Sequence, residues 1–298
     1  MIAVAGATGY IGGLLCRRLR EEGQGVRALA RHPERAEDLR EEGCELCRAD
    51  VLEPETLGLA LEGVEIAYYL VHSMGRGSDG DFVERDHRGA ENFAAAAAAA
   101  GVKRIVYLGG LGEGSKHLDS RHATAEVLRR GSVPVTYFRA AAVIGEGSES
   151  FRTAFYLVRR LPVMVTPRWV ATRTQPIAVA DAVSYLAAAA NLGSPVDREI
   201  EIGGPDVTTY GGMIDELARA LGRRPPLRIT VPLLTPALSS LWIGLVTPVD
   251  AGVAKPLIEG LATETVVTDA SGMSKFPAVE RTPLAKALRD AIRDGSVL

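Results

Sequence analysis

The sequence of 298 residues predicts an α/β fold, in which a Rossmann-type doubly wound parallel sheet is followed by a smaller C-terminal α+β lobe. Short apolar runs alternate with longer helical patterns through the first half, which is typical of parallel strands with helices on both faces. A glycine-rich turn directly follows the first run and opens the first helical pattern. After about Gly145 this alternation stops and prolines become frequent. We therefore expect a dinucleotide-binding domain over 1–145 and a substrate or partner lobe over 146–298, with some of its segments returning to the first sheet.

The expected strands of the sheet are Ile2–Ala5, Val26–Ala30, Glu45–Ala49, Ile66–Val71, Arg104–Leu108 and Val135–Phe138. The helical patterns between and after them are Ile11–Glu22, Glu34–Glu42, Glu55–Leu61, Phe82–Ala100 and His122–Arg130. Gly101 follows the alanine-rich helix, at a place where a residue with positive φ commonly ends a helix. In the second half we expect a strand at Glu199–Ile202 and amphipathic helices at Asp181–Ala190 and Tyr210–Leu221.

Composition excludes several classes of protein. The formal charge of 34 − 37 = −3 gives no broad basic surface, so we expect no nucleic-acid partner. Three cysteines cannot form a disulfide framework, and Met1 runs into the first strand without a signal segment, so we expect the cytoplasm.

The uncharged segment Ile229–Val249 is long enough to cross a bilayer, but three prolines divide it. We interpret it as broken helices that line a pocket or pack on a partner, with peripheral membrane contact as the alternative.

The turn Gly6-Ala7-Thr8-Gly9-Tyr10-Ile11-Gly12 is the strongest functional signal. Glycine lets the backbone approach a pyrophosphate closely, and the N–H groups that open the helix stabilise its charge. The context of strand, turn and helix makes this motif more specific than glycine spacing alone, although a tight turn without a ligand is the alternative. The turn predicts a dinucleotide cofactor.

The end of the second strand distinguishes the two nicotinamide dinucleotides. An acidic residue there binds the ribose 2′-hydroxyl, whereas an arginine suits a 2′-phosphate. Arg31 stands at this place, so we expect NADP(H), with NAD as the alternative. We expect Asp50 and Val51 to meet the adenine side, and Val71, His72 and Ser73 to flank the nicotinamide ribose.

The sequence resembles the short-chain dehydrogenase/reductase superfamily, in its atypical and extended branches. The resemblance rests on the glycine turn, Asp50-Val51 and the segment Phe138–Gly145. More narrowly, the chain resembles the NmrA-like and YbjT-type NAD(P)-binding proteins. That resemblance spans nearly the whole chain and rests on Tyr69–Gly75, Tyr107–Gly112, Pro167–Trp169, Thr174–Ile177 and Trp242–Pro256. It implies a Rossmann-type domain that holds a nicotinamide dinucleotide over a C-terminal substrate lobe, but it names no substrate.

The usual catalytic pair of that superfamily is missing. The resemblance implies a tyrosine with a lysine four residues later to transfer the proton, and none of the eight tyrosines has one. The serine expected on the preceding strand is glycine in Leu108–Leu111. His117 and Arg121 stand at the matching helix start, either as a general acid and a ribose or phosphate ligand or as an exposed solubilising pair. His72 and Ser73 either replace the proton donor or satisfy a turn.

We expect structural roles for the remaining polar features, and no metal site. Cys44 and Cys47 flank a strand and no second pair of ligands follows them. The acidic and histidine residues of Glu84–Glu91 are expected to form a solvated helix face. Tyr107 is expected in the core, and Arg139 either orients an anionic substrate or joins the two lobes by an ion pair.

The sequence thus predicts an oxidoreductase that transfers hydride between NADP(H) and a small organic carbonyl or enone, with the Leu233–Val246 region helping to wall the substrate. The alternative is an NAD(P)H-binding protein without turnover, acting as a redox sensor or an assembly scaffold, because the catalytic pair is missing and the apolar C-terminal segment could be an interface. The substrate and the oligomeric state stay open.

Overall fold

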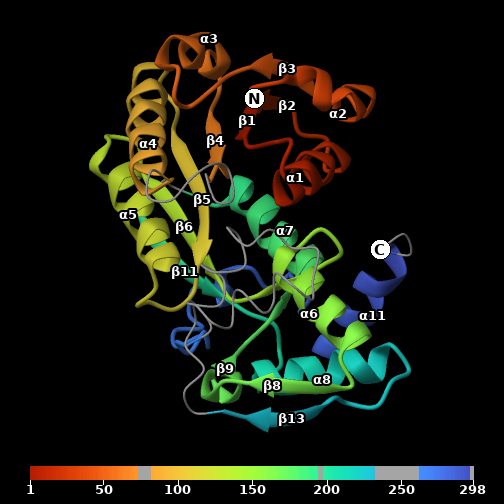
Figure 1. Cartoon of the computed structure of the whole chain (residues 1–298). Helices are drawn as coiled ribbons and strands as arrows, with labels where there is room; N and C mark the ends of the chain where they lie inside the picture. The colour runs from red at the N-terminus through yellow and green to blue at the C-terminus, as the bar shows by residue number, and fades with distance from the viewer. Residues whose placement is uncertain (73–81, 194–196, 232–261, 296–298) are drawn as a thin grey trace.

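A computed structural model of the chain describes residues 1–72, 82–193, 197–231 and 262–295. Its centre is a sheet of seven parallel strands in the order β11-β6-β5-β4-β1-β2-β3 (Figure 1). The strands are β1 (Ile2–Ala5), β2 (Val26–Ala30), β3 (Glu45–Arg48), β4 (Ile66–Tyr69), β5 (Arg104–Gly110), β6 (Val135–Ala140) and β11 (Arg198–Ile202). The order changes direction between β1 and β4, which is where ligands bind in open sheets of this kind. The predicted fold class is confirmed.

Helices cover both faces of the sheet. On one face lie α1 (Tyr10–Glu21), α2 (Glu37–Glu41) and α7 (Val179–Ala188), and on the other α3 (Leu57–Leu61), α4 (Phe82–Ala99) and α5 (Lys116–Arg130). Adjacent strand residues alternate between the two cores: Val4 and Tyr68 pack with α1 and α7, while Ala5 and Tyr69 pack with α3 and α4. This alternation follows from the two-residue period of a strand.

Two predicted helices differ from the structure. The pattern Glu34–Glu42 is not one helix, because Ala36 leaves the helical region at φ −128° between a 3-10 turn (Pro33–Arg35) and α2. The helix expected over His122–Arg130 is longer than predicted, since α5 begins at Lys116. Ser115 is its N-cap, and the Ser115 hydroxyl accepts a hydrogen bond from the Leu118 N–H at 3.2 Å.

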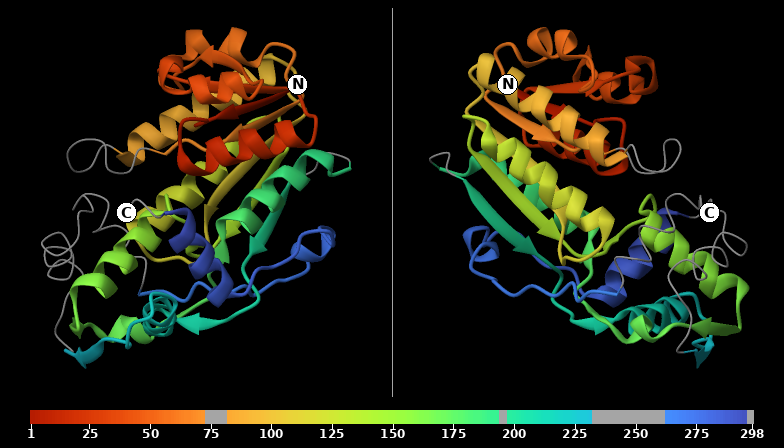
Figure 2. Two further views of the ribbon diagram at one scale, coloured as in Figure 1. Left: turned by 90° about the vertical axis from the view of Figure 1, so that its right-hand side faces the viewer. Right: turned by 60° about the vertical axis from the view of Figure 1, so that its left-hand side comes forward.

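The second half forms a smaller core below the sheet (Figure 2). Its helices are α6 (Glu149–Arg160), α8 (Tyr210–Ala220) and α11 (Leu284–Asp294). Three short strand pairs accompany them: β7 (Val143–Ile144) with β10 (Ile177–Ala178), β8 (Val163–Thr166) with β13 (Leu227–Thr230), and β9 (Arg173–Thr174) with β12 (Thr208–Thr209). Apolar side chains of α6, α8 and α11 pack against one another and against Met164.

Chain from beyond residue 145 also completes the central sheet. Strand β11 pairs with β6, and α7 packs against α1. The buried guanidinium of Arg104 on β5 donates to the carbonyls of Ala189, Leu192 and Gly193 at 2.8, 3.0 and 2.5 Å. These contacts tie the chain that follows α7 to the sheet.

Within the described part of the chain, no helix is long and apolar enough to cross a membrane. The uncharged segment Ile229–Val249 lies almost entirely outside the described residues, which include only its first three. The Leu233–Val246 region that was expected to wall the substrate lies outside them completely.

Candidate dinucleotide-binding cleft

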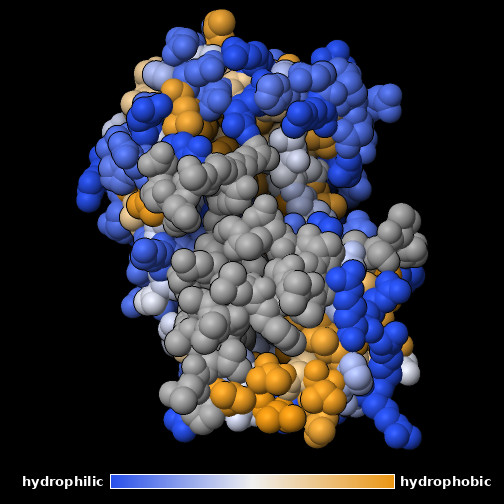
Figure 3. Space-filling model, in the orientation of Figure 1, coloured by the Kyte–Doolittle hydropathy of each residue, from blue (hydrophilic) through white to orange (hydrophobic). Residues whose placement is uncertain are grey.

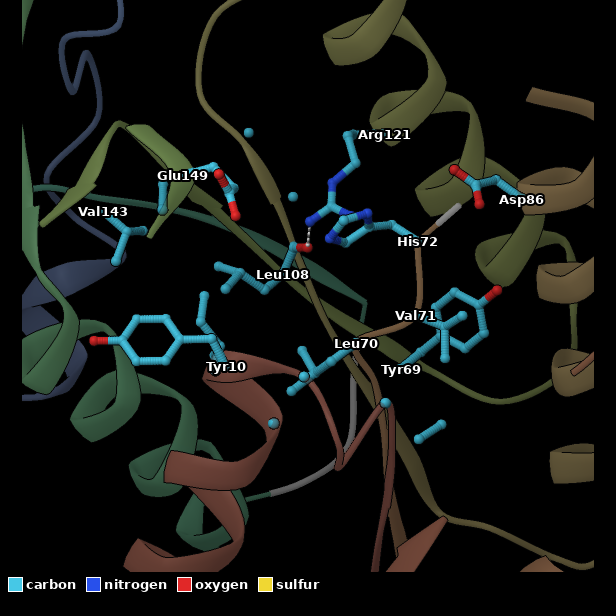
Figure 4. Close-up of a pocket in the computed structure, with 18 of the residues that line it drawn as sticks. Tyr10, Tyr69, Leu70, Val71, His72, Asp86, Leu108, Arg121, Val143 and Glu149 are labelled. Carbon is cyan, nitrogen blue, oxygen red and sulfur yellow. Dashed lines mark hydrogen bonds between the residues drawn. The ribbon is translucent and has the colours of Figure 1, made fainter. Parts of the chain in front are cut away.

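A cleft of about 680 Å³ follows the carboxyl edge of the central sheet, past the loops after β1, β2, β3, β4, β5 and β6 (Figure 4). The predicted cofactor and catalytic residues that line it are Gly6, Thr8, Gly9, Tyr10, Ile11, Gly12, Arg31, Asp50, Val51, Val71, His72, His117 and Arg121. Ala7 does not line the cleft, because its side chain is buried in the core beneath the turn. Ser73 lies outside the described residues. Positions more than a hundred residues apart in the sequence therefore share one cleft.

The glycine turn has a shape that side chains would prevent. Gly6 has a φ of +86°, and a Cβ on it would lie 2.7 Å from the carbonyl oxygen of Leu70. A Cβ on Gly12 would lie 2.2 Å from the carbonyl oxygen of Gly6. The Gly9 N–H donates to that same oxygen at 2.9 Å and closes the turn. The chain thus brings bare backbone to the cleft, as a bound pyrophosphate requires.

Helix α1 begins at this turn without a side-chain cap. Its N-cap is Gly9, and its first turn contains no acidic residue. The first N–H groups of a helix have no partner within the helix, and they carry a partial positive charge. The start of α1 therefore provides donors for an anion and no carboxylate that would repel it.

Arg31 and Arg27, both on or beside β2, have different roles. Arg27 donates to the carbonyls of Ala60 and Glu62 at 3.0 and 2.8 Å and pairs with Glu45, so it serves the structure of the sheet edge. Arg31 lines the cleft, its side chain is exposed, and it has no ion pair among the described residues. Arg31 is therefore the arginine at this end of the cleft that fits a 2′-phosphate.

The loop after β3 forms the neighbouring wall of the cleft. The Asp50 carboxylate accepts a hydrogen bond from the Leu52 N–H at 2.9 Å. The side-chain amide of Asn92 on α4 donates to the carbonyl of Val51 at 2.8 Å. Both predicted adenine-side residues are thus held in a loop that is fixed to α4.

His72, His117 and Arg121 lie together further along the cleft. Arg121 donates to the carbonyl of Leu108 at 2.7 Å (Figure 4). Its guanidinium lies 5.5 Å from the centre of the Tyr107 ring. Loss of hydration within the cleft, and then the charge of Arg121, lower the pKa of His72 to about 4, although the residue as a whole is exposed. The same two causes, followed by the nearby His72, lower the pKa of His117 to about 3. At neutral pH the cleft therefore has two neutral imidazoles beside one fixed cation.

At Gly109, one of the two glycines in Leu108–Leu111, the space for a side chain is filled from a neighbouring strand. A Cβ on Gly109 would lie 2.6 Å from the phenol oxygen of Tyr137. That oxygen is 2.9 Å from Nδ1 of His122, whose Nε2 is 2.8 Å from the carbonyl of Gly112. Because a carbonyl only accepts, Nε2 of His122 donates to Gly112, and in that tautomer Nδ1 accepts a hydrogen bond from the Tyr137 hydroxyl. Tyr137 is buried, and burial raises the pKa of its phenol.

Sequence reasoning missed several lining residues. Asp86 on α4 is only 8% exposed and lines the cleft beside Arg85, so the expected solvated helix face is wrong for it. His87 and Glu91 do form an exposed pair on that helix, 3.4 Å apart. Asp86 and His87 lie about 100° apart around the helix, so they face different surroundings, but only the packing of α4 decides which of them is buried.

The second half supplies Tyr210 and Thr265 to the cleft. The phenol of Tyr210 lies 3.3 Å from the hydroxyl of Thr265, which donates to the hydroxyl of Thr174 at 2.8 Å. No local pattern brings these three residues together, since Thr265 reaches Thr174 only through the tertiary fold.

The remaining sequence expectations concern residues outside the cleft. Tyr107 is fully buried, as predicted for a core residue. Arg139 pairs with Glu199 on β11 at 2.8 Å, which is the ion-pair alternative of its two expected roles. Cys44 interacts with Cys16, and this interaction, followed by burial, raises the pKa of the Cys16 thiol. The described residues contain no cluster of three potential metal ligands.

The sheet order, the glycine turn and the cleft define a dinucleotide-binding protein of the Rossmann type. The family described as NAD(P)H-binding matches residues 6–149. The (4-alkanoyl-5-oxo-2,5-dihydrofuran-3-yl)methyl phosphate reductase of Streptomyces griseus is 31% identical over an alignment of 240 positions that covers 76% of each chain. The chain therefore belongs to the NAD(P)H-binding family, among the atypical short-chain dehydrogenase/reductase proteins that its sequence resembles.

Two further comparisons cover nearly the whole chain. Ceramide reductase of Caulobacter vibrioides is 27% identical over an alignment of 300 positions that covers 97% of this chain and 91% of that protein. The NADPH complex of the NADPH-dependent quinone oxidoreductase of Escherichia coli superposes with a TM-score of 0.79 at 22% identity, over 97% of this chain and 98% of that one. The latter likeness extends the shared fold beyond the NAD(P)H-binding part to the second half.

Proposed function

We propose that the protein is an NADPH-dependent reductase that acts on the carbonyl or the activated double bond of a small organic molecule. The observation that carries this proposal is the single cleft. It begins at the glycine turn and Arg31, passes His72 and Arg121, and ends among residues of the second half such as Glu149 and Tyr210. The cleft thus continues from the residues that fit the dinucleotide to residues of the second half, where a substrate would lie.

The residues present fit NADP(H). Gly6, Gly9 and Gly12 would hold the pyrophosphate, and Arg31 would pair with the 2′-phosphate. Asp50 and Val51 would lie at the adenine, and Val71 and His72 at the nicotinamide ribose. When bound, the cofactor supplies a hydride from C4 of its nicotinamide ring.

The chain's own contribution to the reaction would come from His117, His72 and Arg121. Reduction of a carbonyl places negative charge on its oxygen, and fixed donors stabilise that charge best. Arg121 is held by the Leu108 carbonyl and the Tyr107 ring, so its charge needs little reorganisation. With pKa values of about 3 and 4, His117 and His72 would act at neutral pH as neutral N–H donors and not as imidazolium acids.

The relatives support the substrate class. The Streptomyces griseus reductase has a substrate whose name describes an alkanoyl group on an unsaturated ring, and ceramide reductase is also named as a reductase. We further propose the cytoplasm as the compartment, because the three cysteines are free thiols. A small molecule, and not a nucleic acid, is the proposed partner of the cleft.

The filled serine position favours one second candidate. Because the Tyr137 phenol takes the space at Gly109, the usual hydroxyl cannot stand there. A protein that binds NADPH without turnover, as a redox sensor or an assembly scaffold, would not need it.

A stopped-flow screen of NADPH oxidation against carbonyl and enone libraries distinguishes the two candidates. We expect substrate-dependent oxidation that falls when Arg121 is changed to methionine, while NADPH still binds. Tight NADPH binding without oxidation by any member of either library would favour the sensor instead.

A further inference from the structure

The strand pair β8–β13 exposes an apolar face. The strands run parallel, with Val163 opposite Leu227 and Val165 opposite Ile229. These four side chains, which we call the β8–β13 face, belong to residues that are 44%, 65%, 44% and 51% exposed. They are four of the eight exposed large hydrophobic residues in the described part of the chain. Figure 3 shows hydrophobic surface at the foot of the molecule, where Figure 1 places β8 and β13.

The opposite side of the same strands is packed and partly polar. Met164 is only 2% exposed and belongs to the core of α6, α8 and α11. Arg228 turns inward, pairs with Asp215 and donates to the carbonyl of Gly211 at 2.9 Å. A sheet with one solvated side normally places its polar residues outward, and edge strands normally carry charge. The outward row of four aliphatic side chains reverses that pattern, which indicates that something covers it.

Arginines border this face at one end. Arg159 and Arg160 end α6 just before β8, and Arg223 and Arg224 come just before β13. The guanidinium of Arg223 donates to the carbonyl of Arg159 at 2.6 Å, so the two pairs lie together. All four residues are exposed. The face thus combines aliphatic side chains with a cluster of positive charge.

We propose that the β8–β13 face docks onto the surface of an anionic lipid bilayer. Aliphatic side chains enter the boundary between headgroups and acyl chains, while arginines reach the lipid phosphates. A second copy of the chain fits less well. In a symmetric contact the second copy would offer this face only the same aliphatic side chains, with no acidic side chain among them to pair with the arginines.

Docking would leave the dinucleotide cleft accessible. Glu149 at the start of α6 lines the cleft, whereas Arg160 at its other end borders the β8–β13 face. A helix of 12 residues is about 18 Å long at 1.5 Å per residue. The cleft and the β8–β13 face therefore lie at opposite ends of α6. The inference about the membrane does not depend on the proposed function.

The test is co-sedimentation of the full-length chain with phosphatidylcholine vesicles that contain or lack phosphatidylglycerol. We expect binding to the anionic vesicles only, with an affinity that falls as salt is added. The double substitution Leu227→Glu with Ile229→Glu should weaken binding by at least about tenfold, because it places charge in the apolar layer. Arg223→Gln with Arg224→Gln should weaken binding and reduce its salt dependence.

Leu59→Glu is the matched control, because Leu59 is 76% exposed and lies on α3, at the far side of the sheet from β13. It should bind vesicles like the unchanged protein, and every variant should retain its NADPH affinity. The proposal is overturned if the unchanged protein does not bind anionic vesicles. It is also overturned if the variant with Leu227→Glu and Ile229→Glu binds them as tightly as the unchanged protein. It is also overturned if that variant turns a dimer into a monomer, since the face would then be a protein interface.

Discussion

The phenol oxygen of Tyr137 lies where a side chain on residue 109 would begin, 2.6 Å from a Cβ built on Gly109. The two residues belong to the adjacent strands β5 and β6, and the Tyr137 ring is stacked on Tyr107 at 5.2 Å between centroids. Its hydroxyl is further held by His122. Glycine at 109 and tyrosine at 137 therefore depend on each other, and a hydroxyl side chain cannot be restored by one substitution.

Gly109→Ser should destabilise the fold by about 1–3 kcal/mol, because it overpacks a filled core. Tyr137→Val should also destabilise it, through lost burial and a lost hydrogen bond. The double variant should lose less folding stability than the sum of the losses of the two single variants, since valine leaves the space that the serine needs. Urea unfolding of the four proteins measures this coupling, and strictly additive costs would show that the two positions are independent.

Gly12→Ala should abolish dinucleotide binding. Its Cβ would lie 2.2 Å from the carbonyl oxygen of Gly6, so the turn must open and its N–H groups must move. Fluorescence titration with NADPH measures the loss, for which we expect a decrease in affinity of at least about a hundredfold, or 2.7 kcal/mol. Gly58→Ala on α3 is the control, because its Cβ would meet nothing within 4 Å. An unchanged affinity in Gly12→Ala would remove the turn from the cofactor site.

Arg31→Ala should lower the affinity for NADPH and leave that for NADH unchanged. An arginine pairs with the 2′-phosphate that only NADPH carries, and a charge-assisted pair of this kind contributes about 1.5–3 kcal/mol. Arg35→Ala is the matched control, because Arg35 is also exposed but does not line the cleft. If Arg31→Ala keeps the ratio of the two affinities, the 2′-phosphate is bound elsewhere.

Local signals explain what the sequence could predict. The six strands of the first half and the turn after β1 depend on apolar runs and glycine spacing, which lie within a few residues of each other. Arg31 and Asp50 could be placed because the ends of parallel strands meet at one edge. Asp86, Tyr210 and Thr265 could not be placed in this way. Their positions in the cleft follow from how α4 and the second half pack, and no short spacing encodes that packing.

Acid should destabilise the protein through His117. Its pKa is about 3 in the folded protein, well below the ordinary value. Between these two values, the imidazole is protonated in the unfolded chain but not in the folded protein. Stability should therefore fall as the pH drops from about 6.5 towards 3. His117→Gln should make this fall less steep, because glutamine does not titrate. Urea unfolding at a series of pH values tests the effect, and equal slopes for both proteins would contradict it.

Arg104→Leu should loosen the attachment of the chain after α7 to the sheet. Arg104 is only 4% exposed, and its guanidinium donates hydrogen bonds to the carbonyls of Ala189, Leu192 and Gly193. Removing it leaves these acceptors without their donor, at a cost of about 1–3 kcal/mol for each one that water cannot reach. Arg48→Leu is the control, because the Arg48 side chain is 61% exposed in its pair with Glu53 and such surface pairs contribute about 0–1 kcal/mol. Chemical denaturation should give a loss for Arg104→Leu several times that of the control. Equal losses would mean that packing alone, without these hydrogen bonds, holds this chain against β5.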